Sequence, residues 1–132
     1  MKPIKVLLVD DEEKFVISNA KLLSKRGYDI LTALDGKEAL QKLEVNDIHV
    51  TILDVKMPGM DGIAVLKEIK NRFPLVEVVM LTGHATFESA VSGLKIGAGD
   101  YLMKPCQLSE LIQKIEEAYE KRKINEEKIR HK

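Results

Sequence analysis

The sequence has no charge excess, no cysteine pair and no long apolar run, and each absence excludes a class of protein. Its 21 basic and 21 acidic residues cancel, so no overall positive field would attract nucleic acid or an anionic membrane. Cys106 is the only cysteine, so no disulfide can form within the chain. The beginning of the chain has no signal-type segment, and no apolar run approaches the roughly 20 residues of a membrane-spanning helix. We therefore expect a cytoplasmic protein that binds neither nucleic acid nor membrane by itself.

Apolar runs of strand length recur along the 132 residues, at 4–9, 28–33, 49–54, 76–81 and 100–103. Segments with apolar residues at helical spacing follow these runs, for example Val65, Leu66, Ile69 and Phe73. Alternating strands and helices predict parallel βαβ units, and near-continuous apolar strands predict a sheet that is covered on both faces. The length suits one domain. We expect an α/β three-layer sandwich with a five-stranded parallel sheet and five helices.

The last stretch of the chain, residues 121–132, continues the fifth predicted helix with mixed charges. Ile124 and Ile129 are its only large apolar residues, so it has no stripe that would face a core. We expect residues 1–120 to form the domain. Two interpretations of the stretch that follows stay open: a solvated helical tail, or the start of a linker to an output domain or a dimer partner.

Polar and charged side chains stand where the predicted strands end. In open parallel sheets, ligands bind beyond the carboxyl ends of the strands, near the point where the strand order reverses. That rule selects Asp10 and Asp11 after the first strand, Asp54 at the end of the third, Thr82 after the fourth and Lys104 after the fifth. We expect these five side chains to converge on one edge of the sheet.

The acidic residues of this group indicate a metal site and a phosphoryl acceptor. Carboxylates within about 5 Å of each other repel by roughly 3 kcal/mol per pair at an effective dielectric of 20. Oxygen-only ligation by Asp10 and Asp11 suits Mg²⁺, which would offset the charge of Asp54. A carboxylate beside Mg²⁺, flanked by the Lys104 ammonium and the Thr82 hydroxyl, is suited to accept a phosphoryl group as an acyl phosphate.

Four motifs, in the order LLVDDE, LDVKMPGMDG, MLTGHAT and GAGDYLMKPC, resemble the receiver domain of two-component response regulators. The likeness covers about residues 3–119, and although each motif alone is common, all four at these spacings are specific. The resemblance implies a flavodoxin-like sheet of order 2-1-3-4-5. It also implies a phosphorylation-dependent signalling switch, which is no metabolic enzyme and catalyses only its own phosphorylation and dephosphorylation.

The resemblance assigns a role to each acidic residue of the site. Asp54 would be the phosphoacceptor, and Asp11 and Asp54 would be direct Mg²⁺ ligands. Asp10 would act on the metal largely through water, and the backbone carbonyl of Lys56 would be a further ligand. The donor would be a phosphohistidine on a sensor histidine kinase or a phosphotransfer protein.

The resemblance also implies how the phosphoryl group is read out. Thr82 and Lys104 would contact it, and the Lys104–Pro105 peptide bond would be cis. Tyr101 matches the family's switch aromatic residue, which turns inward when Thr82 is drawn toward the phosphoryl group. The fourth helix, at about 86–96, would form the partner face with the fifth strand and the fifth helix. That face would bind an effector or a second copy of the domain, and the output would come from that effector or from a fused output domain.

Simpler interpretations of the same residues stay open at this stage. The acids at 10–12 would also favour the positive end of the first helix, by about 0.3 to 1 kcal/mol per charge. Asp54 would also suit a loop cap, and Thr82 would suit the satisfaction of loop backbone groups. Lys104 would also fit a surface charge, and Tyr101 would fit simple packing on the fifth strand.

Three other classes of protein fit the residues less well. A flavodoxin-type cofactor module needs a Ser/Thr/Gly-rich phosphate loop after the first strand, where the DDEE acids would repel a phosphate. A phosphohydrolase of the haloacid-dehalogenase type needs Asp-x-Asp there, whereas Asp10 and Asp11 are adjacent. A silent interaction domain would be favoured by the loss of Asp11, Asp54 or Lys104, and all three are present. No glycine-rich nucleotide loop occurs, so ATP is not the expected donor.

Lys56 and His84, two residues after Asp54 and Thr82, are the expected modulators of phosphoryl lifetime. Neither is an acid or an amide that would orient an attacking water, so we predict slow self-dephosphorylation. The decay of the acyl phosphate is compared between the wild type and the variants Lys56→Asn and His84→Glu. Faster loss from the wild type than from both variants would reject the prediction.

Overall fold

A parallel sheet of five strands forms the middle layer of the computed structural model, which describes residues 2–57, 60–83 and 87–130. The strands are β1 (Lys5–Val9), β2 (Asp29–Ala33), β3 (Val50–Leu53), β6 (Glu77–Thr82) and β7 (Asp100–Met103). Their order is β2-β1-β3-β6-β7, and every neighbouring pair is parallel. The predicted order 2-1-3-4-5 is therefore confirmed, and each predicted strand agrees with the structure to within one residue at either end.

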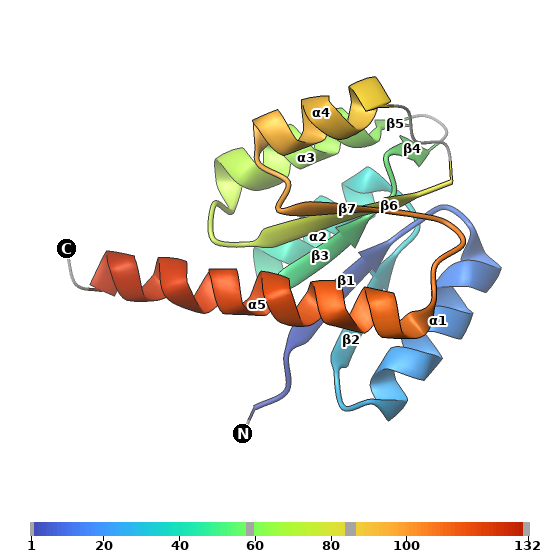
Figure 1. Cartoon of the computed structure of the whole chain (residues 1–132), viewed down its shortest axis with the longest axis horizontal. Helices are drawn as coiled ribbons and strands as arrows, with labels where there is room; N and C mark the ends of the chain where they lie inside the picture. The colour runs from blue at the N-terminus through green and yellow to red at the C-terminus, as the bar shows by residue number, and fades with distance from the viewer. Residues whose placement is uncertain (1, 58–59, 84–86, 131–132) are drawn as a thin grey trace.

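Helices cover the two faces of this sheet (Figure 1), and the described residues form five of them. They are α1 (Glu13–Lys25), α2 (Gly36–Val45), α3 (Gly62–Arg72), α4 (Phe87–Ile96) and α5 (Leu108–Arg130). Alternate residues of each strand face opposite layers, so Leu7 and Val9 pack with α2 and α3, whereas Val6 and Leu8 pack with α1 and α5. The three-layer α/β sandwich predicted from the apolar pattern is confirmed.

A short antiparallel hairpin between β3 and α3 was not predicted from the sequence. Its strands are β4 (Lys56–Met57) and β5 (Met60–Asp61), in which Lys56 pairs with Asp61. Two residues per strand are too few to produce a recognisable alternation of apolar and polar side chains. The hairpin matters because it carries the chain directly from the end of β3 to the start of α3.

Helix α5 continues without a break through residue 120 and ends at Arg130. The buried Arg122 anchors this continuation: its guanidinium donates to the carbonyl of Ile48 at 2.8 Å and to Asp47 at 3.3 Å. One turn earlier, the Tyr119 ring meets the His49 ring edge to face at 5.2 Å. The later turns of α5 extend past the sheet (Figure 1), and both Ile124 and Ile129 are exposed.

Within the residues that the structure describes, no helix combines the length and the apolar character that a membrane span requires.

Thr51 in the middle of β3 supplies a test of the core. The residue is fully buried, and its hydroxyl has no hydrogen-bond partner among the described residues. A buried hydroxyl without a partner destabilises a fold, and valine has nearly the same shape without that group. Thr51→Val should therefore raise the free energy of unfolding by about 1 kcal/mol in a urea titration. Thr51→Ser, which keeps the hydroxyl and loses the methyl group, is the control and should be less stable than the wild type. A Thr51→Val variant that is less stable than the wild type would contradict the prediction.

Candidate functional site

The carboxyl ends of four strands bring the predicted site residues to one edge of the sheet. Asp10 and Asp54 directly follow β1 and β3, and the backbone N–H of Asp54 donates to the carbonyl of Val9 at 3.0 Å. Thr82 is the last residue of β6, and its carbonyl accepts from the backbone N–H of Lys104 at 3.0 Å. The hydrogen bonding of the sheet therefore continues one residue beyond the strands and fixes the backbone from which these side chains extend.

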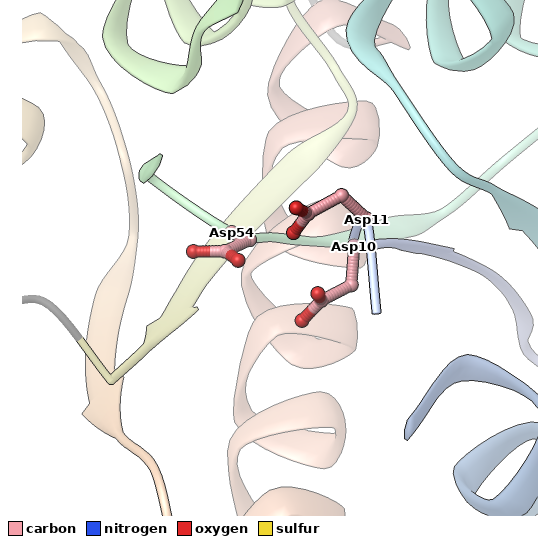
Figure 2. A group of neighbouring side chains, drawn as sticks. All are labelled: Asp10, Asp11 and Asp54. Carbon is pink, nitrogen blue, oxygen red and sulfur yellow. The ribbon is translucent and has the colours of Figure 1, made fainter. Parts of the chain in front are cut away.

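Three carboxylates form a cluster at this edge, as Figure 2 shows. Asp10, Asp11 and Asp54 each offer an oxygen, and these oxygens all lie within 4.8 Å of one another. Asp10 and Asp54 are only 1% and 3% exposed, whereas Asp11 is exposed to solvent. Two buried acids and one exposed acid make a site that is open on one side and supplies only oxygen ligands. Such a donor set fits a hard divalent cation such as Mg²⁺.

Lys104 is the cation that the structure places beside these acids. Its ammonium lies 2.5 Å from Asp10, 3.0 Å from Glu12 and 3.9 Å from Asp54. The ammonium also lies over the ring of Phe15, 4.2 Å from the ring centroid. Only 14% of the lysine side chain is exposed. Among the described residues, one ammonium thus faces several carboxylates, and that ammonium is itself largely shielded from water.

Burial and neighbouring charges shift the ionisation of this pair. Burial raises the pKa of Asp10, and the charge of Asp54 adds to that rise, while the hydrogen bond from Lys104 opposes it. Burial by itself would lower the pKa of Lys104, but the hydrogen bonds to Asp10 and Glu12 outweigh it, so that pKa is raised. Lys104 therefore stays protonated. Any further positive charge that enters the cluster would stabilise the ionised form of the buried Asp10.

The turn from β1 into α1 explains why the acids stand together in the sequence. One oxygen of Asp10 accepts the backbone N–H of Glu12 at 3.0 Å, and Glu12 is the residue that precedes α1. Acidic residues at this end of a helix also lie near the positive pole of its dipole. Asp10 therefore closes this turn and also joins the acidic cluster, so it has a structural role in the turn, and its role at a metal stays a prediction.

Gly62 fixes the backbone on the other side of Asp54. Its N–H donates to the carbonyl of Val55 at 2.9 Å. A Cβ atom at this position would lie 2.2 Å from that oxygen and 2.6 Å from the carbonyl oxygen of Asp54. Such distances leave no room for a side chain, and the clashing atoms belong to the backbone. Only glycine allows α3 to begin directly against the segment that carries Asp54.

The remaining predicted residues lie as follows. Thr82 is fully buried at the end of β6, and the Lys104–Pro105 peptide bond is cis, as the resemblance implied. Tyr101 packs against the core on the α2 and α3 side, and its hydroxyl is buried with no hydrogen-bond partner among the described residues. Lys56 begins β4, and His84 lies outside the described residues. Their predicted roles stay predictions.

Two contacts of Lys104 were not predicted from the sequence. The carboxylate of Glu12 and the ring of Phe15 both reach its ammonium from the start of α1. Glu12 stands in the acidic run at the start of the first helix, but nothing in the sequence pairs it with Lys104. Phe15 looks like an ordinary apolar residue of a helix face, so no signal in the sequence separates it from its neighbours.

Comparison with known proteins places the chain in a family. The family model described as the response regulator receiver domain matches residues 6–116. A putative NtrX-like response regulator of Rickettsia bellii is 37% identical over 131 residues, which cover 98% of this chain and 27% of that protein. The alkaline phosphatase synthesis transcriptional regulatory protein PhoP of Bacillus subtilis is 42% identical over 101 residues, 76% of this chain and 42% of that protein.

Solved structures give the same result. The crystal structure of a CheY-like receiver domain protein from Methanospirillum hungatei JF-1 superposes with a TM-score of 0.89 at 30% identity, covering 93% of this chain and 98% of the other. The chain thus spans less than half of the two curated relatives but nearly all of this single-domain structure. The fold, the acidic edge and these matches agree, and the chain belongs to the response regulator receiver-domain family.

Proposed function

We propose that Asp54 is the phosphoacceptor of this receiver domain and that a phosphohistidine on a sensor histidine kinase or a phosphotransfer protein is the donor. The observation that carries the proposal is the cluster of Asp10, Asp11 and Asp54 oxygens within 4.8 Å, with the Lys104 ammonium 3.9 Å from Asp54. A buried carboxylate in this setting is held in place, and it is faced by the positive charge that phosphoryl transfer needs.

Phosphoryl transfer to Asp54 depends mainly on the positioning of the reacting groups and on charge neutralisation. An oxygen of Asp54 forms a bond to phosphorus, the bond from phosphorus to the donor imidazole breaks, and the imidazole nitrogen keeps the electron pair. Asp10, Asp11, Asp54 and the main-chain carbonyl of Lys56 would hold Mg²⁺, which supplies charge neutralisation at the phosphoryl oxygens when bound. Lys104 donates to a phosphoryl oxygen from the end of β7. The domain thus promotes only its own phosphorylation and dephosphorylation.

Thr82 and Tyr101 couple the phosphoryl group to the surface. The Thr82 hydroxyl moves to bind a phosphoryl oxygen. The space that the hydroxyl vacates favours the inward position of the Tyr101 ring. The inward tyrosine gains apolar contacts, but its buried hydroxyl gains no hydrogen bond from the described residues. Water would satisfy that hydroxyl in an outward position, so the missing hydrogen bond offsets part of the apolar gain of the inward packing. The face made by α4, β7 and α5 carries this change to an effector or to a second copy of the domain.

The long relatives support a linker role for the end of α5. We take residues 1–120 as the receiver domain and residues 121–132 as an extension, helical as far as Arg130, that leads toward an output domain. The NtrX-like relative is several times longer than the matched region, and α5 runs as one helix to Arg130. A cytoplasmic location fits the single, unpaired cysteine and a kinase donor.

The phosphoacceptor is tested by chemical labelling. Incubation with Mg²⁺ and acetyl phosphate should add one phosphoryl group to the wild type, visible by mass spectrometry, and none to Asp54→Ala. Asp29→Ala is the matched control, because Asp29 is an exposed aspartate at the start of β2, and it should be labelled like the wild type. Equal labelling of Asp54→Ala and the wild type would remove the assignment.

The metal site is tested by stability. Asp11 is the exposed member of the cluster, so Asp11→Asn relieves repulsion without breaking the ion pair of Lys104 with Asp10. Without Mg²⁺ the variant should be more stable than the wild type by about 1 kcal/mol. With Mg²⁺ at about 100 times its dissociation constant, the wild type should gain about 2.7 kcal/mol and the variant much less.

Thermal unfolding with and without MgCl₂ measures both effects, and Asp29→Asn serves as the charge-matched control. An equal gain from Mg²⁺ in Asp11→Asn and the wild type would exclude Asp11 as a ligand.

A further inference from the structure

The ammonium of Lys104 has two partners that the proposed chemistry does not use. The Glu12 carboxylate lies 3.0 Å away and the Phe15 ring centroid 4.2 Å away. Glu12 directly precedes α1, Phe15 lies in its first turn, and Asp10, which binds the ammonium at 2.5 Å, stands two residues before Glu12. Asp54 is the most distant of its carboxylate partners, at 3.9 Å. The ammonium is therefore held by residues between the end of β1 and the start of α1, and it lies farther from Asp54 than from the carboxylates of Asp10 and Glu12.

Glu12 and Phe15 hold the ammonium by different means. The side chain of Glu12 is 65% exposed, so solvent and salt weaken its attraction for Lys104. Phe15 is partly buried and packs against the core between the sheet and the helices α1 and α5, so its ring is fixed. A fixed ring face that covers an ammonium is a directional contact, and it excludes water from one side of the charge. The ring is thus the firmer of the two restraints.

We propose that Glu12 and Phe15 are positioning residues that keep Lys104 at the α1 side of the acidic cluster until Asp54 carries a phosphoryl group. This inference rests on the proposed function of Asp54 and concerns the regulation of that same site. Without the restraint, the three carboxylates would draw the ammonium toward their centre, where it would compete with a divalent cation. With the restraint, the space among the three carboxylates stays available to a divalent cation. The phosphoryl group must then draw Lys104 away from the Phe15 ring.

The restraint predicts an unusual effect of a neutral substitution. Because Lys104 leaves the ring when the phosphoryl group arrives, the contact with Phe15 opposes phosphoryl binding. Phe15→Leu removes the ring without changing any charge, so it should tighten the binding of beryllofluoride, a phosphoryl mimic, by about threefold in the presence of Mg²⁺. Phe15→Tyr keeps a ring and should bind like the wild type. Glu12→Gln is less informative, because the loss of a negative charge favours an anion in any case.

Nuclear magnetic resonance follows the lysine directly. The side-chain protons of Lys104 lie near the ring face, so in the unliganded wild type and in Phe15→Tyr their signals should be shifted upfield. Phe15→Leu should lack that shift from the outset. When Mg²⁺ and beryllofluoride are added, the upfield shift in the wild type should disappear as Lys104 moves toward Asp54. A purely structural role for Phe15 would leave the upfield shift of the Lys104 signals in place when beryllofluoride binds.

The outcomes separate this inference from the proposed function. Bound beryllofluoride is detected by its fluorine signal, and an absence of binding to the wild type would overturn the role of Asp54 and the inference with it. Binding that leaves the Lys104 signals shifted upfield would overturn the inference alone. Equal beryllofluoride affinity of Phe15→Leu and the wild type would also overturn the inference and leave the role of Asp54 intact. Loss of the upfield shift on binding, together with tighter binding by Phe15→Leu, supports it.

Discussion

The repulsion among three carboxylates at one edge of the sheet is the constraint on which the rest of the site depends. Asp10, Asp11 and Asp54 hold their oxygens within 4.8 Å, and two of these residues are almost fully buried. At such distances two buried carboxylate charges repel by about 3 kcal/mol at an effective dielectric of 20, and solvent weakens the repulsion that involves the exposed Asp11. A fold that keeps this arrangement holds like charges close together, and a divalent cation bound among them would offset that repulsion.

The backbone keeps the acids together against this repulsion. Parallel pairing carries the ends of β1 and β3 to the same edge, and the hydrogen bond from Asp54 to Val9 ties the two ends to each other. Gly62 lets α3 begin directly on the carbonyls of Asp54 and Val55, where any side chain would collide. Apolar burial on both faces of the sheet supplies the free energy that holds these segments in place. The repulsion is therefore confined to the carboxylates at this edge, and apolar burial throughout the core holds them in place.

Much of this arrangement could be predicted from the sequence, because strands have a clear apolar signature and the rule for strand ends names the residues that follow. Asp10, Asp54 and Lys104 were found in that way. The contact of Phe15 with Lys104 was not, because it depends on the angle at which α1 leaves the sheet, which no local pattern encodes. The hairpin of β4 and β5 was missed for a related reason, since its pairing comes from the tight connection to α3 and not from side-chain alternation.

The central claim is that a divalent cation shares the three carboxylates. The most direct measurement is a crystal structure of the protein soaked in Mn²⁺, an oxygen-seeking stand-in for Mg²⁺ whose anomalous scattering locates it without ambiguity. The account predicts one strong peak within ligand distance of carboxylate oxygens from Asp11 and Asp54, with Asp10 close by. A fully occupied Mn²⁺ elsewhere on the protein, with none among these residues, would contradict it.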